Sequence, residues 1–231
     1  MNKMQFVLID ESNGATTSAG TALSPAVLEQ IAVAATVYLN RDVAAYWGLP
    51  IGATVRVGDA SSIQAGEWAF VLFATLPEAP DAIAYHDVDG NGVPVLFDAV
   101  SLSDSLIGSG QSVSVAITHE LAETLGDQSC NFWADDGKGQ EHALELCDAV
   151  ENSDYLVTGV ACSNFVLPSF FNPTHAGPYD FLKVLTSPFQ TQGYQIVRTS
   201  GTGETQVQGK ARRLAKRQHA LSRTFRRGAR L

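Results

Sequence analysis

Cysteine is scarce in this chain. Its 231 residues include only Cys130, Cys147 and Cys162, which are too few and too far apart for a disulfide framework or a CxxC zinc knuckle. Long apolar runs are also missing, because nothing approaches the roughly 20 residues of a membrane span. The first apolar stretch reaches Asp10 and Glu11 too soon for a secretory signal peptide. We therefore expect a protein of a reducing, cytoplasmic compartment that makes no membrane contact.

Basic residues are scarce in most of the chain, and acidic residues are missing from its last part. Residues 1–204 carry all 24 acidic side chains but only six basic ones, a net charge of −18. Residues 210–231 carry the other nine basic side chains and no acidic one. The acidic body argues against a plain nucleic-acid binder, whereas the basic tail could dock on an acidic protein surface or bind the phosphates of DNA.

These shifts in composition predict the domain organisation. We expect one domain over 1–198, with an N-terminal part at 1–126 and a C-terminal part at 127–198. A segment rich in Gly and Thr, 199–209, is typical of a linker, and 210–231 would form the basic tail.

The hydrophobic pattern predicts an α+β fold. The order is a strand, a long helix, several strands and a second helix. Ser24 and Pro25 would cap and begin the long helix, and Gly126 would follow the end of the second. The expected strands are 5–9, 54–57, 68–74, 83–86 and 93–97, and the expected helices are 24–46 and 112–125.

The second helix carries an HExxE motif. His119 and Glu123 are four residues apart and would project from one face of the helix, with Glu120 beside His119. In HExxH metalloproteases this arrangement holds Zn²⁺, and the adjacent Glu polarises a metal-bound water. Zincin metalloproteases also place a strand, a helix and further strands before this helix. We therefore expect a zincin-like domain with a divalent metal, zinc first, and with Glu120 as general base.

Two features leave alternatives open. A Glu in place of the second His makes the metal a weaker Lewis acid and favours harder ions such as Mn²⁺ or Ca²⁺, so the site could bind metal without catalysis. The motif could also be the solvated edge of an amphipathic helix.

The third ligand should lie outside the motif. In the gluzincin class of zincins it is a Glu on a later helix, and Glu145 lies 22 residues after Glu123. A helix over 141–151 would present Glu141, Glu145 and Asp148 on one face. We assign Glu145 as ligand and Asp148 as the carboxylate that orients His119. Asp148, Asp127 and His142 are the reserve ligands, and an acidic solvated face is the structural alternative.

The sequence DVDGNG, residues 87–92, matches the first half of a calcium loop. Its oxygen ligands would be Asp87, Asp89 and Asn91, with Asp98 at the last position. The flanks are strand-like, and a β-hairpin turn explains the same residues. We favour the hairpin.

Beyond the motif, the chain resembles a family of zincin-like phage and prophage proteins, some of which are virion-associated. Most of 35–195 is covered in order. The shared blocks are RD (41–42), WG (47–48), AYHD (84–87), THELAETLGD (118–127), ELCDAVE (145–151), SNFVLP (163–168), PYDF (178–181) and GY (193–194).

The resemblance implies a metal site at His119, Glu123 and Glu145 and a location in the virion or else in the host cytoplasm. It favours a structural or assembly protein, with an active metallopeptidase as the alternative. In that setting the basic tail would bind other virion proteins or further copies of the chain, with packaged DNA as the second choice.

Overall fold

The computed structural model describes residues 3–199 and the backbone of 204–208. Its main sheet has the strand order β2-β1-β3-β5-β4, in which β4 alone runs antiparallel and forms one edge. All the predicted strands of this region are present. They are β1 (Gln5–Glu11), β2 (Thr54–Gly58), β3 (Glu67–Phe73), β4 (Ala84–Val88) and β5 (Pro94–Ala99).

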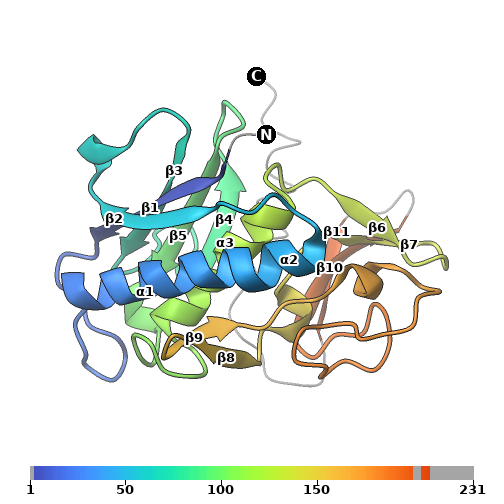
Figure 1. Ribbon diagram of the computed structural model, residues 1–231. Coiled ribbons are helices and arrows are strands. Elements are labelled where there is room, and N and C mark those ends of the chain that lie inside the picture. The colour runs from blue at the N-terminus through green and yellow to red at the C-terminus, as the bar shows by residue number, and fades with distance from the viewer. Residues whose placement is uncertain (1–2, 200–203, 209–231) are drawn as a thin grey trace.

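The long helix begins where the sequence predicts. α1 (Pro25–Val37) is capped by the Ser24 side chain, which accepts a hydrogen bond from the backbone N–H of Val27. The helix continues through a π-helical segment, Tyr38–Ala44, into α2 (Ala45–Trp47). It stops at Gly48, whose φ of 63° lies in the left-handed region that favours glycine. In Figure 1 this continuous helix crosses the front of the molecule.

The HExxE helix, α3 (Val113–Gly126), lies in the interior. It packs against β4 and β5 of the sheet and against β9 (Val160–Ser163). Polar side chains fix it to β9: the Ser114 hydroxyl donates to the carbonyl of Ala161 at 2.7 Å, and the backbone N–H of Ser163 donates to Thr118 Oγ1 at 3.0 Å. Because both sides of the helix are covered, His119, Glu120 and Glu123 are all buried, and a solvated helix edge is excluded.

The end of α3 differs from the prediction. Gly126 is the last helical residue, and Asp127 is the C-cap. A Cβ on Gly126 would lie 2.5 Å from Cδ1 of Leu146, so glycine is needed there to let the chain around Leu146 approach the helix closely. It does not supply a left-handed turn.

The C-terminal part is built from short strands. A four-stranded sheet has the order β11-β10-β7-β6, and β8 pairs with β9 in a separate hairpin. The strand β11 lies within the segment 199–209 that we expected to be a linker, and it pairs with β10. The basic tail, 210–231, lies outside the described residues. The bounds are β6 (Trp133–Asp135), β7 (Gln140–Ala143), β8 (Asp154–Val157), β10 (Tyr194–Thr199) and β11 (Glu204–Gln208).

The predicted helix over 141–151 is also wrong. Glu141 and His142 belong to β7, which pairs with β10, and the only helical residues of the segment form a 3₁₀ turn at Asp148–Val150. Pairing with a distant strand overrides the helical spacing of the acidic residues, a spacing that local sequence alone would favour. Glu141, Glu145 and Asp148 therefore do not share a helix face.

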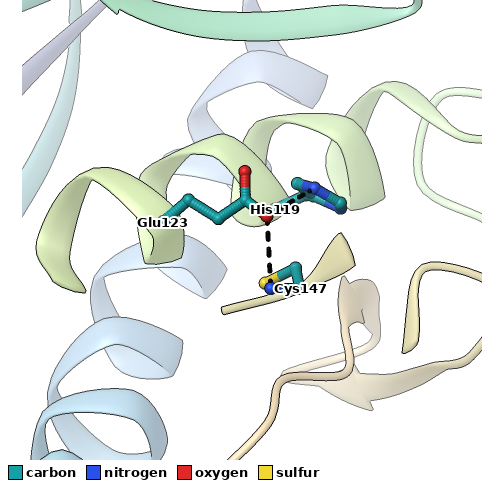
Figure 2. Close-up of side chains that lie close together, drawn as sticks. All are labelled: His119, Glu123 and Cys147. Carbon is teal, nitrogen blue, oxygen red and sulfur yellow. Dashed lines mark hydrogen bonds and ion pairs between the residues drawn. The ribbon is translucent and has the colours of Figure 1, made fainter. Parts of the chain in front are cut away.

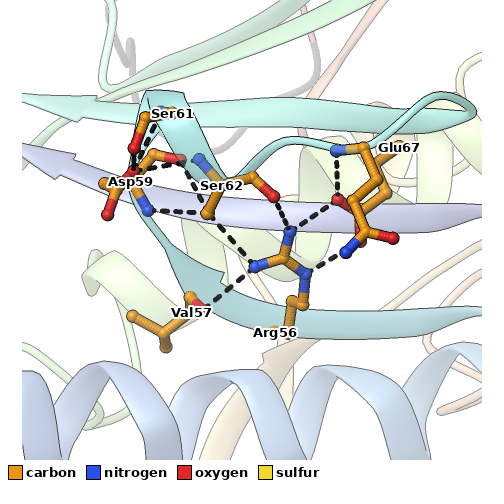
Figure 3. A network of polar contacts seen from close by, with 7 residues as sticks. Arg56, Val57, Asp59, Ser61, Ser62 and Glu67 are labelled. Atoms are coloured by element: carbon orange, nitrogen blue, oxygen red, sulfur yellow. Dashed lines mark hydrogen bonds and ion pairs between the residues drawn. The ribbon is translucent and has the colours of Figure 1, made fainter.

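The connection between β2 and β3 is held by one arginine. The Arg56 guanidinium donates to both carboxylate oxygens of Glu67, at 2.8 and 2.5 Å, and to the carbonyl of Ser62 at 2.8 Å (Figure 3). The Arg56 hydrogen bond lowers the pKa of Glu67 to about 2. This network lies on the exposed side of the sheet edge opposite β4, and it serves the fold.

A candidate metal centre

Four segments bring histidines and carboxylates together beneath the sheet. His86 comes from β4, and Asp98 comes from β5. The helix α3 supplies its motif residues, and the segment after β7 supplies 145–148. The acidic and histidine side chains concerned are all at most 5% exposed: His86, Asp98, His119, Glu120, Glu123, Glu145 and Asp148.

The first cluster surrounds the imidazole of His119. Its Nε2 lies 3.0 Å from Glu123 Oε1 and 3.1 Å from Asp148 Oδ1. The backbone N–H of Cys147 donates to the same Glu123 oxygen at 3.2 Å, so the segment after β7 is fixed to α3 at this point. Figure 2 shows His119 and Glu123 on α3 and Cys147 facing them. Ligand atoms of His119, Glu123 and Cys147 all lie within 4.8 Å of one another.

The second cluster surrounds the imidazole of His86. Its Nδ1 lies 2.8 Å from Glu120 Oε2 and 3.5 Å from Glu123 Oε2, and its Nε2 lies 3.7 Å from Glu145 Oε2. Ligand atoms of His86, Glu120 and Glu123 again lie within 4.8 Å of one another. His86 was not among the residues predicted for the site, although it stands inside the AYHD block. The one signal that could have found it is a histidine at an inward position of a strand.

The donor atoms fit a divalent cation. Two ligand atoms that each lie about 2.1 Å from one ion are about 3.0 to 3.4 Å apart in octahedral or tetrahedral geometry. The separations around His119 and His86 fall at or near this range. The chemistry also fits, since imidazole and carboxylate donors suit zinc and manganese.

The charges of these residues also favour a bound cation. Glu120, Glu123, Glu145 and Asp148 form a buried group of carboxylates that contact the imidazoles of His86 and His119. Several ionised carboxylates in a low-dielectric interior repel one another strongly unless cations compensate them. The imidazoles of His86 and His119 can supply such charge when they are protonated.

Raised pKa values already reduce part of this buried negative charge. Burial, with the charge of Glu120, raises the pKa of Asp98 well above its usual range. Burial alone would lower the pKa of His86, but its interactions with Cys130, Glu120 and Glu145 outweigh that effect and raise the pKa. Burial, followed by the Glu123 charge, also raises the pKa of the Cys147 thiol. A metal ion would displace the proton from an imidazole that binds it.

A surface cleft reaches this centre. It is lined by Ile83 and Ala84 at the start of the edge strand β4, by the loop and first turns that begin α3, and by His119 and Glu120. The side chains that would hold and use an ion thus border an opening to solvent. A fully closed structural site would lack such an opening.

The predicted ligands divide into three outcomes. His119 and Glu123 lie together, as the motif requires, and Asp148 contacts His119 as expected. Glu145 lies in the same centre but closest to His86. Asp127 instead accepts a hydrogen bond from the backbone N–H of Phe132 at 2.7 Å, at the end of α3.

The remaining reserve ligand lies elsewhere. His142 Nδ1 is 2.7 Å from Gln195 Oε1, within the second sheet. Burial lowers the pKa of His142.

Residues 87–92 form the hairpin turn that we favoured over a calcium loop. Asp89 accepts hydrogen bonds from the backbone N–H groups of Asn91 and Val93, at 2.8 and 2.9 Å, between the antiparallel strands β4 and β5. Asp87 accepts one from the backbone N–H of Val88. Asp98 pairs in register with Ala84 at the other end of the hairpin, so it cannot complete a loop of ligands with Asp89.

Comparisons with known proteins add no relative to this geometry. No protein-family model matches the chain, and neither the curated proteins nor the solved structures give a match. Among the described residues, no helix combines the length and apolar character needed to cross a membrane. The geometry of the buried histidines and carboxylates is therefore the basis for a function.

Proposed function

We propose that the chain is a zincin-like metal-dependent hydrolase that acts on peptide bonds. The ion would be held by His119 and Glu123 with a third ligand from the segment after β7, where the Asp148 carboxylate contacts His119 and the Cys147 thiol lies with both motif residues. The observation that carries the proposal is the position of His119 Nε2, between Glu123 Oε1 at 3.0 Å and Asp148 Oδ1 at 3.1 Å, beside an open cleft.

Asp148 is a better third ligand than Glu145 for this position. Its carboxylate is already within 3.1 Å of the His119 nitrogen, whereas Glu145 Oε2 is directed to the imidazole of His86. Two carboxylates and one imidazole form an oxygen-rich donor set, which accepts Zn²⁺ and also harder ions such as Mn²⁺. When bound, the ion supplies Lewis acidity to a substrate carbonyl.

Glu120 is the residue placed for proton transfer. It follows His119 directly, borders the same cleft, and is held by His86 through a 2.8 Å contact. A general base needs this position beside the reacting groups and a fixed orientation. In the metal-loaded protein Glu120 would accept a proton from the attacking water and donate it to the leaving amine.

The edge strand suggests how a substrate is presented. In the described sheet β4 pairs with β5 alone, and its first residues line the cleft. The outer backbone groups of an edge strand can pair with an extended peptide. A peptide bound along β4 would bring one of its carbonyls near His119 and Glu120.

A virion assembly role is the second candidate, with the metal kept for stability. It is supported by the charge division of the sequence, since a tail with nine basic residues could dock on the acidic body of a neighbouring protein. The cleft that Glu120 lines favours hydrolysis, because an assembly site has no need of an opening beside its metal ligands.

The full-length protein should be stripped with a chelator, reloaded with Zn²⁺ or Mn²⁺ and assayed on a mixture of quenched fluorescent peptides. Glu120→Gln should keep the tightly bound ion and lose hydrolysis by about 10²-fold or more. Glu29→Gln, at an exposed position of α1, is the matched control. Equal metal content with equal hydrolysis in wild type and Glu120→Gln would contradict the hydrolase.

A further inference from the structure

Glu123 faces two histidines with its two oxygens. Oε1 lies 3.0 Å from His119 Nε2, and Oε2 lies 3.5 Å from His86 Nδ1. A carboxylate that uses one oxygen on each side is the usual bridge between two ions about 3.5 to 4 Å apart. The proposed function uses only the His119 side.

The His86 side has a donor set of its own. Ligand atoms of His86, Glu120 and Glu123 lie within 4.8 Å of one another, and these side chains are 2%, 0% and 1% exposed. Glu145 Oε2 lies 3.7 Å from the other nitrogen of the same imidazole. One imidazole nitrogen and the two carboxylates on its side, Glu120 and Glu123, are enough to hold a divalent cation.

An independent observation comes from β5. Asp98 is fully buried, and neither of its carboxyl oxygens has a hydrogen-bond partner among the described residues. Because Asp98 pairs with Ala84, and His86 lies two residues further along β4, Asp98 and His86 point to the same face of the sheet. Glu120 interacts with Asp98 electrostatically. A buried carboxyl group without partners therefore lies beside this second donor set.

We propose that His86, Glu120 and Glu123 form a second divalent-cation position, bridged to the first by Glu123. This inference rests on the first metal position of the proposed function. Its consequence is regulatory: an ion on Glu120 withdraws that carboxylate from proton transfer. The protein would thus be active with one ion and inhibited when excess metal fills the second position.

The test is the number of ions bound. The metal-free full-length protein should be titrated with Zn²⁺ by calorimetry, and its content measured after equilibrium dialysis. Wild type should bind two ions per chain in two steps of different affinity, and His86→Gln should bind one fewer. His142→Gln removes a buried histidine outside the centre and should match wild type. The readout is the difference between variants in the number of Zn²⁺ ions bound per chain. Weak binding at exposed histidines such as His175 is the same in each protein and cancels in this difference.

Each outcome decides between the two proposals. One ion in both wild type and His86→Gln would overturn the second position and leave the first intact. No ion in wild type would overturn both. If His86→Gln fails to fold by circular dichroism, Glu120→Gln replaces it with an isosteric change and should also lose one equivalent. Two ions in every folded variant would contradict the assignment of His86 and Glu120.

Discussion

The Nδ1 atom of His86 lies 2.8 Å from Oε2 of Glu120, although 34 residues separate them in the chain. The contact joins the edge strand of the main sheet to the HExxE helix. It places an imidazole beside the carboxylate that the motif assigns to proton transfer. Whether the Glu120 carboxylate is available for proton transfer would therefore depend on whether His86 contacts it directly or binds a metal ion beside it.

The first prediction concerns excess metal. The rate of peptide hydrolysis should rise with free Zn²⁺ as the His119 position fills and then fall as a second ion binds Glu120. In His86→Gln the fall should shift to at least tenfold higher Zn²⁺, because the second position loses its nitrogen ligand. A rate that rises to the same plateau in both proteins would contradict the inhibitory position.

The second prediction concerns stability. An ion that binds only the folded state at 100 times its Kd adds about 2.7 kcal/mol to the free energy of unfolding. For a chain of this size, this should raise Tm by about 5 to 10 °C. The measurement is a thermal melt with and without Zn²⁺ or chelator. His119→Gln should abolish most of the rise, whereas His142→Gln should retain it.

The third prediction concerns pH. Burial raises the folded-state pKa of Asp98, whereas an unfolded Asp titrates near about 3.9. The stabilising effect of its neutral form is fully present below that pH and is lost as pH rises toward the folded pKa. Asp98→Asn cannot ionise, so in the metal-free protein its stability relative to wild type should increase with pH above about 4.

Urea unfolding with chelator at several pH values measures this effect. The gap between Asp98→Asn and wild type should widen by at most about 1.4 kcal/mol per pH unit. Asp81→Asn, at an exposed position, should follow wild type throughout. A constant gap between Asp98→Asn and wild type from pH 4 to 8 would show that Asp98 has an ordinary pKa.

The fourth prediction concerns the support of Asp148. A Cβ on Gly193 would overlap the backbone oxygen of Asp148 and lie 2.7 Å from Cγ of Glu151. Gly193→Ala should therefore displace Asp148, costing about 1 to 3 kcal/mol of stability and weakening Zn²⁺ binding by at least tenfold. Gly90→Ala, where a Cβ meets nothing within 4 Å, should change neither. Unaltered Zn²⁺ affinity in Gly193→Ala would argue against Asp148 as a ligand.

Local sequence was enough for the elements that carry the motif. Ser24 does cap the first helix, and apolar strand residues such as Phe70 and Leu96 are buried in the core. The motif spacing placed His119 and Glu123 together because a helix of ordinary geometry brings residues four apart onto one side. These predictions used interactions between neighbours in the sequence.

The remaining features depended on distant partners. The acidic residues of 141–151 have helical spacing, but β7 pairs with β10, more than 50 residues away, and the helix does not form. His86 could not be chosen from sequence because its partners, Glu120 and Glu145, meet it only after the edge strand packs on α3. The strand β11, in the segment expected to be a linker, likewise pairs with β10.

The position of the cleft also bears on how fast ions exchange. The centre is covered by the sheet on one side and, on another, by the segment that the backbone of Cys147 fixes to Glu123. The cleft between β4 and the beginning of α3 opens from solvent to His119. A peptide lying along β4 would close that route. Substrate and metal would therefore enter and leave through the same cleft. A bound substrate would slow the dissociation of the ion that acts on it.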